Sequence, residues 1–127
     1  MFNLKFYYCT HCKNIAVKAV DKGVPMMCCG EKMVELAPGS VDAATEKHVP
    51  VATVSGNTVA VEVGEVAHPM DDDHSILFIA LETTAGFQLA RLAPGEPPEA
   101  SFALADGTRA VAAYAYCDKH GLWAAEI

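Results

Sequence analysis

Four of the chain's five cysteines lie near its N-terminus, in the stretch Cys9-Thr10-His11-Cys12 and the adjacent pair Cys28-Cys29. A Pro-Gly-Ser sequence at residues 38–40 is typical of a linker, so we expect an N-terminal domain of residues 1–37 and a second domain of residues 38–127. A domain of fewer than about 40 residues rarely folds on hydrophobic burial alone and usually needs disulfides, a metal or a partner chain. The clustered cysteines therefore constrain how the first domain can fold.

The spacing of these cysteines favours a metal site. Two residues between Cys9 and Cys12 allow a tight turn to direct both sulfurs at one ion, and four thiolates in a tetrahedron suit zinc or a single iron. The pair Cys28-Cys29 is unusual, because a zinc ribbon repeats the Cys-x2-Cys spacing and adjacent side chains point in different directions. We expect a strained tetrahedron. Unrelated thiols or disulfides are the alternative, and spacing does not decide between iron and zinc.

The charge of the chain excludes some functions. Nine Lys and Arg stand against sixteen Asp and Glu, a formal net charge of −7, whereas a nucleic-acid binder needs a basic face. No apolar run reaches the roughly 18 residues needed to span a bilayer, and the N-terminus has no secretory pattern. We therefore expect a cytoplasmic protein that binds neither nucleic acid nor membrane. In the reducing cytoplasm, cysteines usually bind metal rather than form disulfides.

The second domain is predicted to be mainly β. Short apolar segments alternate with turn residues such as Gly56-Asn57 and Asp106-Gly107, which is typical of hairpins. About seven strands are predicted, at residues 49–54, 59–63, 75–83, 87–92, 99–105, 108–116 and 122–126. With no convincing helix, this pattern predicts an antiparallel β-sandwich of the immunoglobulin-like kind.

A second set of possible metal ligands lies at the strand ends and loops of this domain. Its members are His48, His68, His74, Cys117 and His120. Neutral imidazoles suit divalent iron, copper, zinc or nickel, and one thiolate softens the site. A blue-copper site would use two His, one Cys and an axial Met, and a structural zinc site would close with four ligands. Five candidates exceed both, and would leave a six-coordinate ion one open position.

Five motifs together resemble the desulfoferrodoxins, the two-iron superoxide reductases. They occur in the order of that family and span nearly the whole chain. They are Cys9-Thr10-His11-Cys12, Cys28-Cys29-Gly30, Glu46-Lys47-His48-Val49-Pro50, His68-Pro69-Met70 with His74, and Cys117-x2-His120-Gly121-Leu122-Trp123.

The resemblance implies two mononuclear irons. The N-terminal domain would be desulforedoxin-like or rubredoxin-like and would hold the first iron, centre I, through Cys9, Cys12, Cys28 and Cys29. The sandwich would hold the second iron, centre II, through four equatorial imidazoles, His48, His68, His74 and His120, and the axial thiolate of Cys117. The resemblance also implies a homodimer that reduces superoxide to hydrogen peroxide with one electron and two protons. A rubredoxin-like carrier would return the electron.

The resemblance also assigns roles to two residues that precede the first histidine ligand. Lys47 would attract the superoxide anion and order the water that delivers a proton. Glu46 would bind the ferric ion once product leaves. A solvated charge pair is the alternative for both residues. A non-catalytic electron-transfer protein and a zinc-stapled binding module are the competing functions.

Overall fold

The computed structural model describes residues 3–127 and divides them into two compact units, one ending at Ala37 and the other running from Pro38 to Ile127. Antiparallel strands dominate both units, which confirms the predicted mainly β class. Within the described residues, no helix has the length and apolar character needed to cross a membrane.

The first unit is built from very short strands. Strand β1 (Tyr7–Tyr8) pairs with β2 (Ile15–Ala16) on one side and with β5 (Val34–Glu35) on the other. A separate hairpin joins β3 (Met27–Cys28) to β4 (Glu31–Lys32). Among the described residues of this unit only Phe6 and Cys9 are fully buried. So small a core cannot hold the unit together by hydrophobic burial alone.

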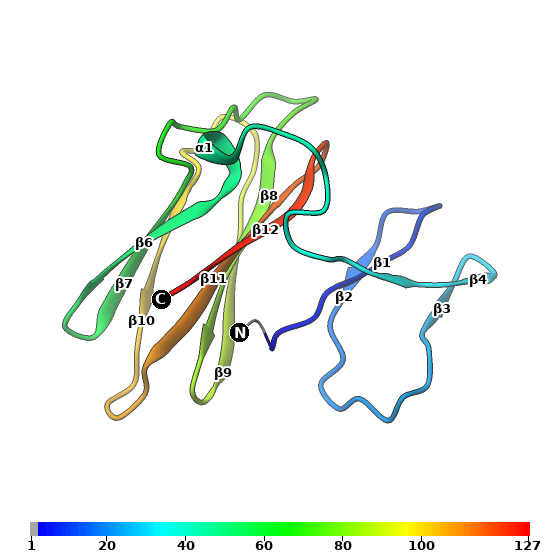
Figure 1. Cartoon of the computed structure of the whole chain (residues 1–127), viewed down its shortest axis with the longest axis horizontal. Coiled ribbons are helices and arrows are strands. Elements are labelled where there is room, and N and C mark those ends of the chain that lie inside the picture. The colour runs from blue at the N-terminus through cyan, green and yellow to red at the C-terminus, as the bar shows by residue number, and fades with distance from the viewer. Residues whose placement is uncertain (1–2) are drawn as a thin grey trace. The chain divides into compact units, whose positions relative to one another are not determined.

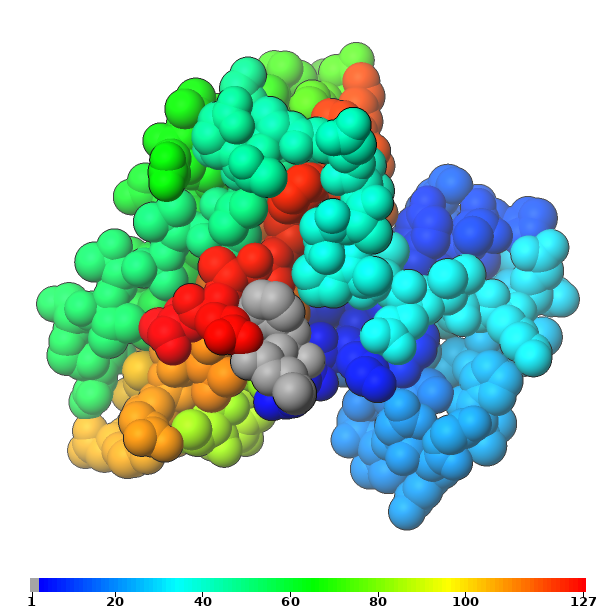
Figure 2. Space-filling model, viewed as in Figure 1, coloured from blue at the N-terminus to red at the C-terminus, as the bar shows by residue number. Residues whose placement is uncertain are grey.

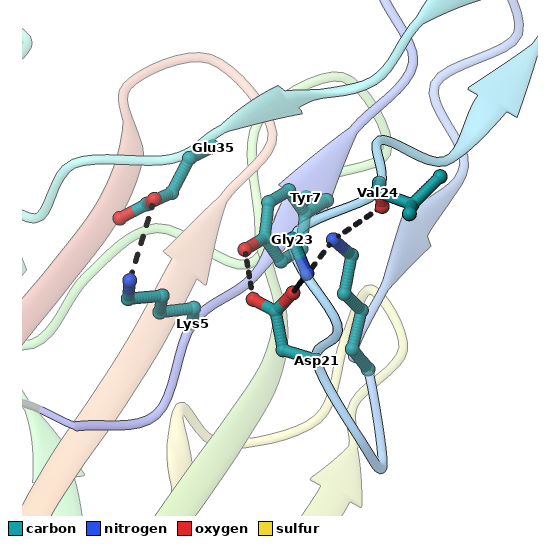
Figure 3. Close-up of polar contacts among 7 residues, drawn as sticks. Lys5, Tyr7, Asp21, Gly23, Val24 and Glu35 are labelled. Carbon is teal, nitrogen blue, oxygen red and sulfur yellow. Dashed lines mark hydrogen bonds and ion pairs between the residues drawn. The ribbon is translucent and has the colours of Figure 1, made fainter.

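A polar network supports the long loop between β2 and β3 (Figure 3). The Asp21 carboxylate accepts hydrogen bonds from the Gly23 N–H (2.8 Å) and the Tyr7 hydroxyl (3.4 Å). The Lys18 ammonium donates to Asp21 (3.2 Å) and to the Val24 carbonyl (2.8 Å), and it lies 5.0 Å from the centre of the Tyr7 ring. Because the Lys18 side chain is only 13% exposed, these contacts form a partly desolvated clamp.

The second unit is a β-sandwich of two antiparallel sheets (Figure 1). One sheet has the order β10-β7-β6 and the other β12-β11-β8-β9. The strands are β6 (Pro50–Ser55), β7 (Thr58–Val63), β8 (Ile76–Thr83), β9 (Gly86–Arg91), β10 (Glu99–Ala103), β11 (Ala110–Cys117) and β12 (Gly121–Glu126). Their bounds differ from the predicted ranges by at most two residues, and the immunoglobulin-like sandwich is confirmed.

The core lies between the two sheets and follows the alternation of the strands. Inward positions of β7 are Val59, Val61 and Val63, all at most 1% exposed, while Glu62 points outward. They pack with Phe102 and Leu104, on and just after β10 of the same sheet, and with inward residues of the facing sheet, namely Ile76, Ile79, Leu81, Ala113, Ala115 and Cys117. The thiol of Cys117 thus lies at the edge of the apolar core.

The segments that carry the predicted ligands gather at one end of the sandwich. Figure 1 shows the helix α1 (Thr45–His48), the loop before β8 and the turn between β11 and β12 at this end. The chain after Pro38 runs beside β12 (Figure 2), where the Gly39 N–H donates to the Leu122 carbonyl at 2.8 Å. No helix was predicted from the sequence; α1 is a single turn, too short to show a helical hydrophobic period.

Gly64, at the end of β7, fixes the position of α1. Its φ of +82° is left-handed, and a Cβ built on it would lie 2.7 Å from the Glu46 oxygen and from the Lys47 carbonyl carbon. The same corner is held by the Gly64 N–H, which donates to Val49 O at 3.1 Å, and by the Val66 N–H, which donates to Glu46 O at 2.9 Å. Only glycine allows this close approach.

Replacing Gly64 with alanine should therefore destabilise this end of the sandwich. We expect Gly64→Ala to lower the free energy of unfolding by about 3 kcal/mol or more, since a backbone clash adds to the left-handed strain. Gly107→Ala is the matched control, because Gly107 has a φ of +85° with nothing within 4 Å; it should cost about 1–2 kcal/mol. Urea denaturation measures both, and equal losses would contradict the proposed contact.

Candidate metal centres

The four N-terminal cysteines converge on one point. All are free, and their sulfurs lie within 4.8 Å of one another. The Cys12 and Cys28 sulfurs are 3.5 Å apart and those of Cys28 and Cys29 are 4.0 Å apart. A tetrahedron with metal–sulfur bonds of about 2.3 Å has edges of about 3.8 Å. The four thiols therefore fit one tetrahedral ion.

The backbone of Cys29 shows how adjacent cysteines can share an ion. Its φ of +52° is left-handed, and Gly30 follows with a φ of +77°. Non-glycine residues rarely adopt this conformation, which turns the chain back on itself. Lys13, directly after Cys12, is also left-handed, with a φ of +69°. The strain expected from the adjacent pair thus lies in the backbone.

The electrostatics of this group favour a cation once all four sulfurs are ionised. The N–H groups of Cys12 and His11 lower the pKa of Cys9 to about 6. Hydrogen bonding with the Cys12 and Cys9 sulfurs raises the pKa of Cys28 to about 12. Four thiolates so close together cannot all be anionic without a positive ion between them. The donor set and its charge therefore fit zinc or iron.

The four predicted histidines form the corners of a near-square. Neighbouring ring centres lie 4.6 to 5.0 Å apart with interplanar angles of 76–90°, in the order His48, His68, His74, His120. The diagonal pair, His48 and His74, is 6.5 Å apart, longer than the sides by close to the factor √2 of a square. The His48 Nε2 atom lies 3.1 Å from both His68 Nε2 and His120 Nδ1. Nitrogen ligands about 2.1 Å from a metal and at right angles lie about 3.0 Å apart.

The Nε2 atoms of His48 and His68 face each other with their lone pairs. His48 Nδ1 donates to the Ala44 carbonyl (2.7 Å) and His68 Nδ1 donates to the Pro69 carbonyl (2.6 Å), because a carbonyl oxygen can only accept. Burial lowers the pKa of both rings, that of His68 to about 4, so both are neutral at pH 7. Their Nε2 atoms then have no proton to share across 3.1 Å. A cation between them removes this repulsion.

A further nitrogen lacks any protein partner. His74 Nε2 is a buried side-chain atom without a hydrogen bond among the described residues. Native proteins seldom leave such an atom unsatisfied. His74 is presented by a tight turn in which the backbones of Asp71 and His74 bond each other in both directions, at 2.9 and 3.2 Å. Its orphaned nitrogen is an independent sign that the group holds a metal.

Cys117 completes this second group. Its sulfur is 3.8 Å from His120 Nδ1 and within 4.8 Å of the donor atoms of His48 and His74. Burial raises the pKa of this thiol, whereas the N–H groups of Lys119 and His120 bond the sulfur and act the other way. A buried thiolate with two N–H donors is a charged ligand stabilised for a metal.

Trp123 supports two ligands, a role that the sequence analysis did not assign. Its indole ring stacks on His48 at a centroid distance of 5.1 Å, and its Nε1–H donates to the His120 carbonyl at 3.0 Å. The residue is 5% exposed. The one tryptophan of the chain, three residues after a Cys-x2-His pair, was the available signal.

Glu46 and Lys47 are exposed on α1, directly before His48. The charge of Glu46 acts on the His48 imidazole and raises its pKa slightly against the larger effect of burial. For the Lys47 ammonium, the described part of the chain offers no hydrogen bond or ion pair. Both residues therefore adjoin the first ligand in sequence, and the described residues show no hydrogen bond from either side chain to its ring.

Comparisons with known proteins agree with this geometry. A family model described as Desulfoferrodoxin matches residues 40–126. The curated protein "Desulfoferrodoxin" of Syntrophotalea carbinolica is 41% identical over 123 residues, which covers 97% of this chain and 96% of the relative. This chain belongs to the desulfoferrodoxin family.

Solved structures give the same result for the fold. The superoxide reductase of Treponema pallidum superposes with a TM-score of 0.83 at 36% identity, over 98% of this chain and 100% of that one. The superoxide reductase (1Fe-SOR) of Giardia intestinalis superposes with a TM-score of 0.55 at 35% identity, over 65% of this chain and 97% of that one. The two metal-holding groups match the two-iron arrangement of desulfoferrodoxins, so the predicted pair of sites is confirmed.

The two groups should lose metal independently, because each draws its ligands from one unit. We expect Cys29→Ser to empty the first site and His74→Ala to empty the second, so that each variant binds about one metal per chain where the parent binds about two. Metal analysis and visible spectra measure this, and each variant is the control for the other. Loss of both metals from either variant would contradict the prediction.

Proposed function

We propose that this desulfoferrodoxin is a superoxide reductase that converts superoxide, one electron and two protons into hydrogen peroxide. The observation that carries the proposal is the square of four imidazoles with one buried thiolate beside it. Five ligands leave one position of a six-coordinate ion free for a small anion. When bound, ferrous iron would supply the electron from this position.

We assign the ligands of both irons from these groups. Centre I would be held by Cys9, Cys12, Cys28 and Cys29. Centre II would be held by His48, His68, His74, His120 and Cys117. The Ala44 and Pro69 carbonyls, through the Nδ1–H groups of His48 and His68, aim the free Nε2 lone pairs inward. Such partners fix the tautomer and make the imidazole a better ligand.

The exposed pair on α1 would act on the substrate and on the open position. We assign to Lys47 the attraction of the anion and the ordering of the water that delivers a proton, and to Glu46 occupation of the open position after product leaves. Both neighbour His48 in sequence. The support from the structure is that Gly64 leaves α1 little room to move.

The local charge would outweigh the acidity of the whole chain. The formal net charge is −7, which by itself repels superoxide. Fe²⁺ with one thiolate is positive, and Lys47 adds a further positive charge. Since the Debye length at physiological salt is about 8 Å, distant carboxylates are screened while groups beside the open position are not.

The proposal extends to partners and location. We propose a rubredoxin-like carrier as electron donor, a homodimer as the assembly, and the cytoplasm as the compartment. Exposed apolar side chains of the first unit, namely Val20, Val24, Met27 and Val34, are available for contact with another protein. Five free cysteines fit a reducing compartment. Sedimentation of the holoprotein tests the dimer, and reduction by a rubredoxin tests the donor.

Pulse radiolysis of the reduced protein tests the activity. Superoxide should oxidise the second centre rapidly and yield hydrogen peroxide without dioxygen. Slow oxidation would favour an electron-transfer protein without turnover. Zinc in place of iron, with no visible colour, would favour a metal-stapled binding module.

Removing Lys47 tests the guidance of the anion. We expect Lys47→Ala to lower the second-order rate with superoxide by about tenfold at low ionic strength and to flatten its dependence on salt, because a local attraction is lost. Pulse radiolysis over a series of salt concentrations measures both quantities.

Arg109→Ala is the charge-matched control for this variant. Arg109 is exposed and directly precedes β11. The start of β11 lies at the end of the sandwich away from α1 (Figure 1). Arg109→Ala should leave both the rate and the salt slope nearly unchanged. An unchanged rate and slope in Lys47→Ala would remove Lys47 from the mechanism.

A further inference from the structure

The ladder between β8 and β11 is interrupted just before the sulfur ligand. Tyr116 lies opposite Phe78, whereas Cys117 lies opposite Ile76, so the register shifts between them and Leu77 is skipped. A bulge bends the strand and redirects the following side chain, and bulges are frequent beside active sites. The position of the sulfur therefore depends on what holds the chain beyond the bulge.

Asp118 holds the chain at that point. Its N–H donates to the Ser75 carbonyl at 3.2 Å, and its carboxylate Oδ1 accepts the Ser75 N–H at 3.0 Å. A side-chain oxygen thus stands where a main-chain carbonyl would continue an antiparallel pair. Ser75 is 1% exposed, so its N–H would otherwise be buried without a partner, at a cost of about 1–3 kcal/mol.

This clasp joins the neighbours of two metal ligands. Asp118 follows Cys117 directly, and Ser75 follows His74 directly. We propose that Asp118 is a positioning residue for the second centre, whose carboxylate holds the Cys117 sulfur at a set place relative to the His74 imidazole. The role lies in the position of the acceptor oxygen and not in its charge. The importance of this role for catalysis rests on the proposed function, whereas its effect on the metal site can be measured without any assay of activity.

Substitutions of Asp118 separate the position of the acceptor oxygen from the charge of the carboxylate. Asp118→Asn keeps an acceptor oxygen in the same place and removes the charge. Asp118→Glu keeps the charge and moves the carboxylate by one methylene. Asp118→Ala removes the acceptor altogether. Asp72→Ala is the control for charge, because Asp72 is an exposed carboxylate in the turn before His74, with no hydrogen bond from its side chain among the described residues.

The measurements are made on the iron-loaded full chain. They are the thiolate-to-iron absorption band of the second centre, iron retention against a chelator, and the rate with superoxide. We expect Asp118→Asn and Asp72→Ala to match the parent in the absorption band and in iron retention. Asp118→Glu and Asp118→Ala should shift the band and weaken iron retention by about tenfold, as the loss of groups that orient ligands generally does. The band of the four-cysteine iron reports whether each variant has folded.

Three results would overturn the inference. The first is an unshifted band and unchanged retention in both Asp118→Glu and Asp118→Ala. The second is an Asp118→Asn that behaves like Asp118→Ala, which would assign the effect to charge. The third is an equal shift in Asp72→Ala. If Asp118→Ala does not fold, the Asn and Glu variants still decide. A parent protein that superoxide does not oxidise would refute the proposed function, while the absorption band would still decide the role of Asp118.

Discussion

The Nε2 lone pairs of His48 and His68 point at each other and repel unless a positive ion lies between them, and much of the sandwich end is arranged to hold these rings in place. The Nδ1–H groups of His48 and His68 each donate a hydrogen bond to a backbone carbonyl, and the Nε2 atoms of the two rings are 3.1 Å apart. His74 Nε2 is buried without a partner. In water such nitrogens would be solvated or protonated. Here burial keeps the two paired rings neutral, so the energy of the arrangement is recovered only when a metal binds.

The fold provides this arrangement through rigid connections at the strand ends. Gly64 lets β7 approach the backbone of α1, which places His48. The bulge before Cys117 and the clasp of Asp118 on Ser75 set the sulfur. Trp123 covers His48 and bonds the carbonyl of His120. His48, Cys117 and His120 are thus held by contacts with different parts of the sandwich, as precise metal geometry requires.

The small first unit also depends on a group of metal-binding side chains, but for its stability. With only Phe6 and Cys9 fully buried among its described residues, it relies on the four sulfurs and on the clamp of Lys18 and Asp21. The left-handed backbone of Cys29 is a strain that metal binding can offset. The two units therefore use metal differently: one as a large part of its stability, the other as the centre of its proposed chemistry.

The sequence by itself determined the β class, the strand ranges and the two groups of candidate metal ligands, because alternation, turn residues and ligand spacing are local properties of the chain. It did not predict α1, whose single turn has no periodicity, or the roles of Asp118 and Trp123. Nor could spacing show that His48 lies opposite His74 in the square. These features arise from contacts between segments far apart in sequence, so only the tertiary structure decided them.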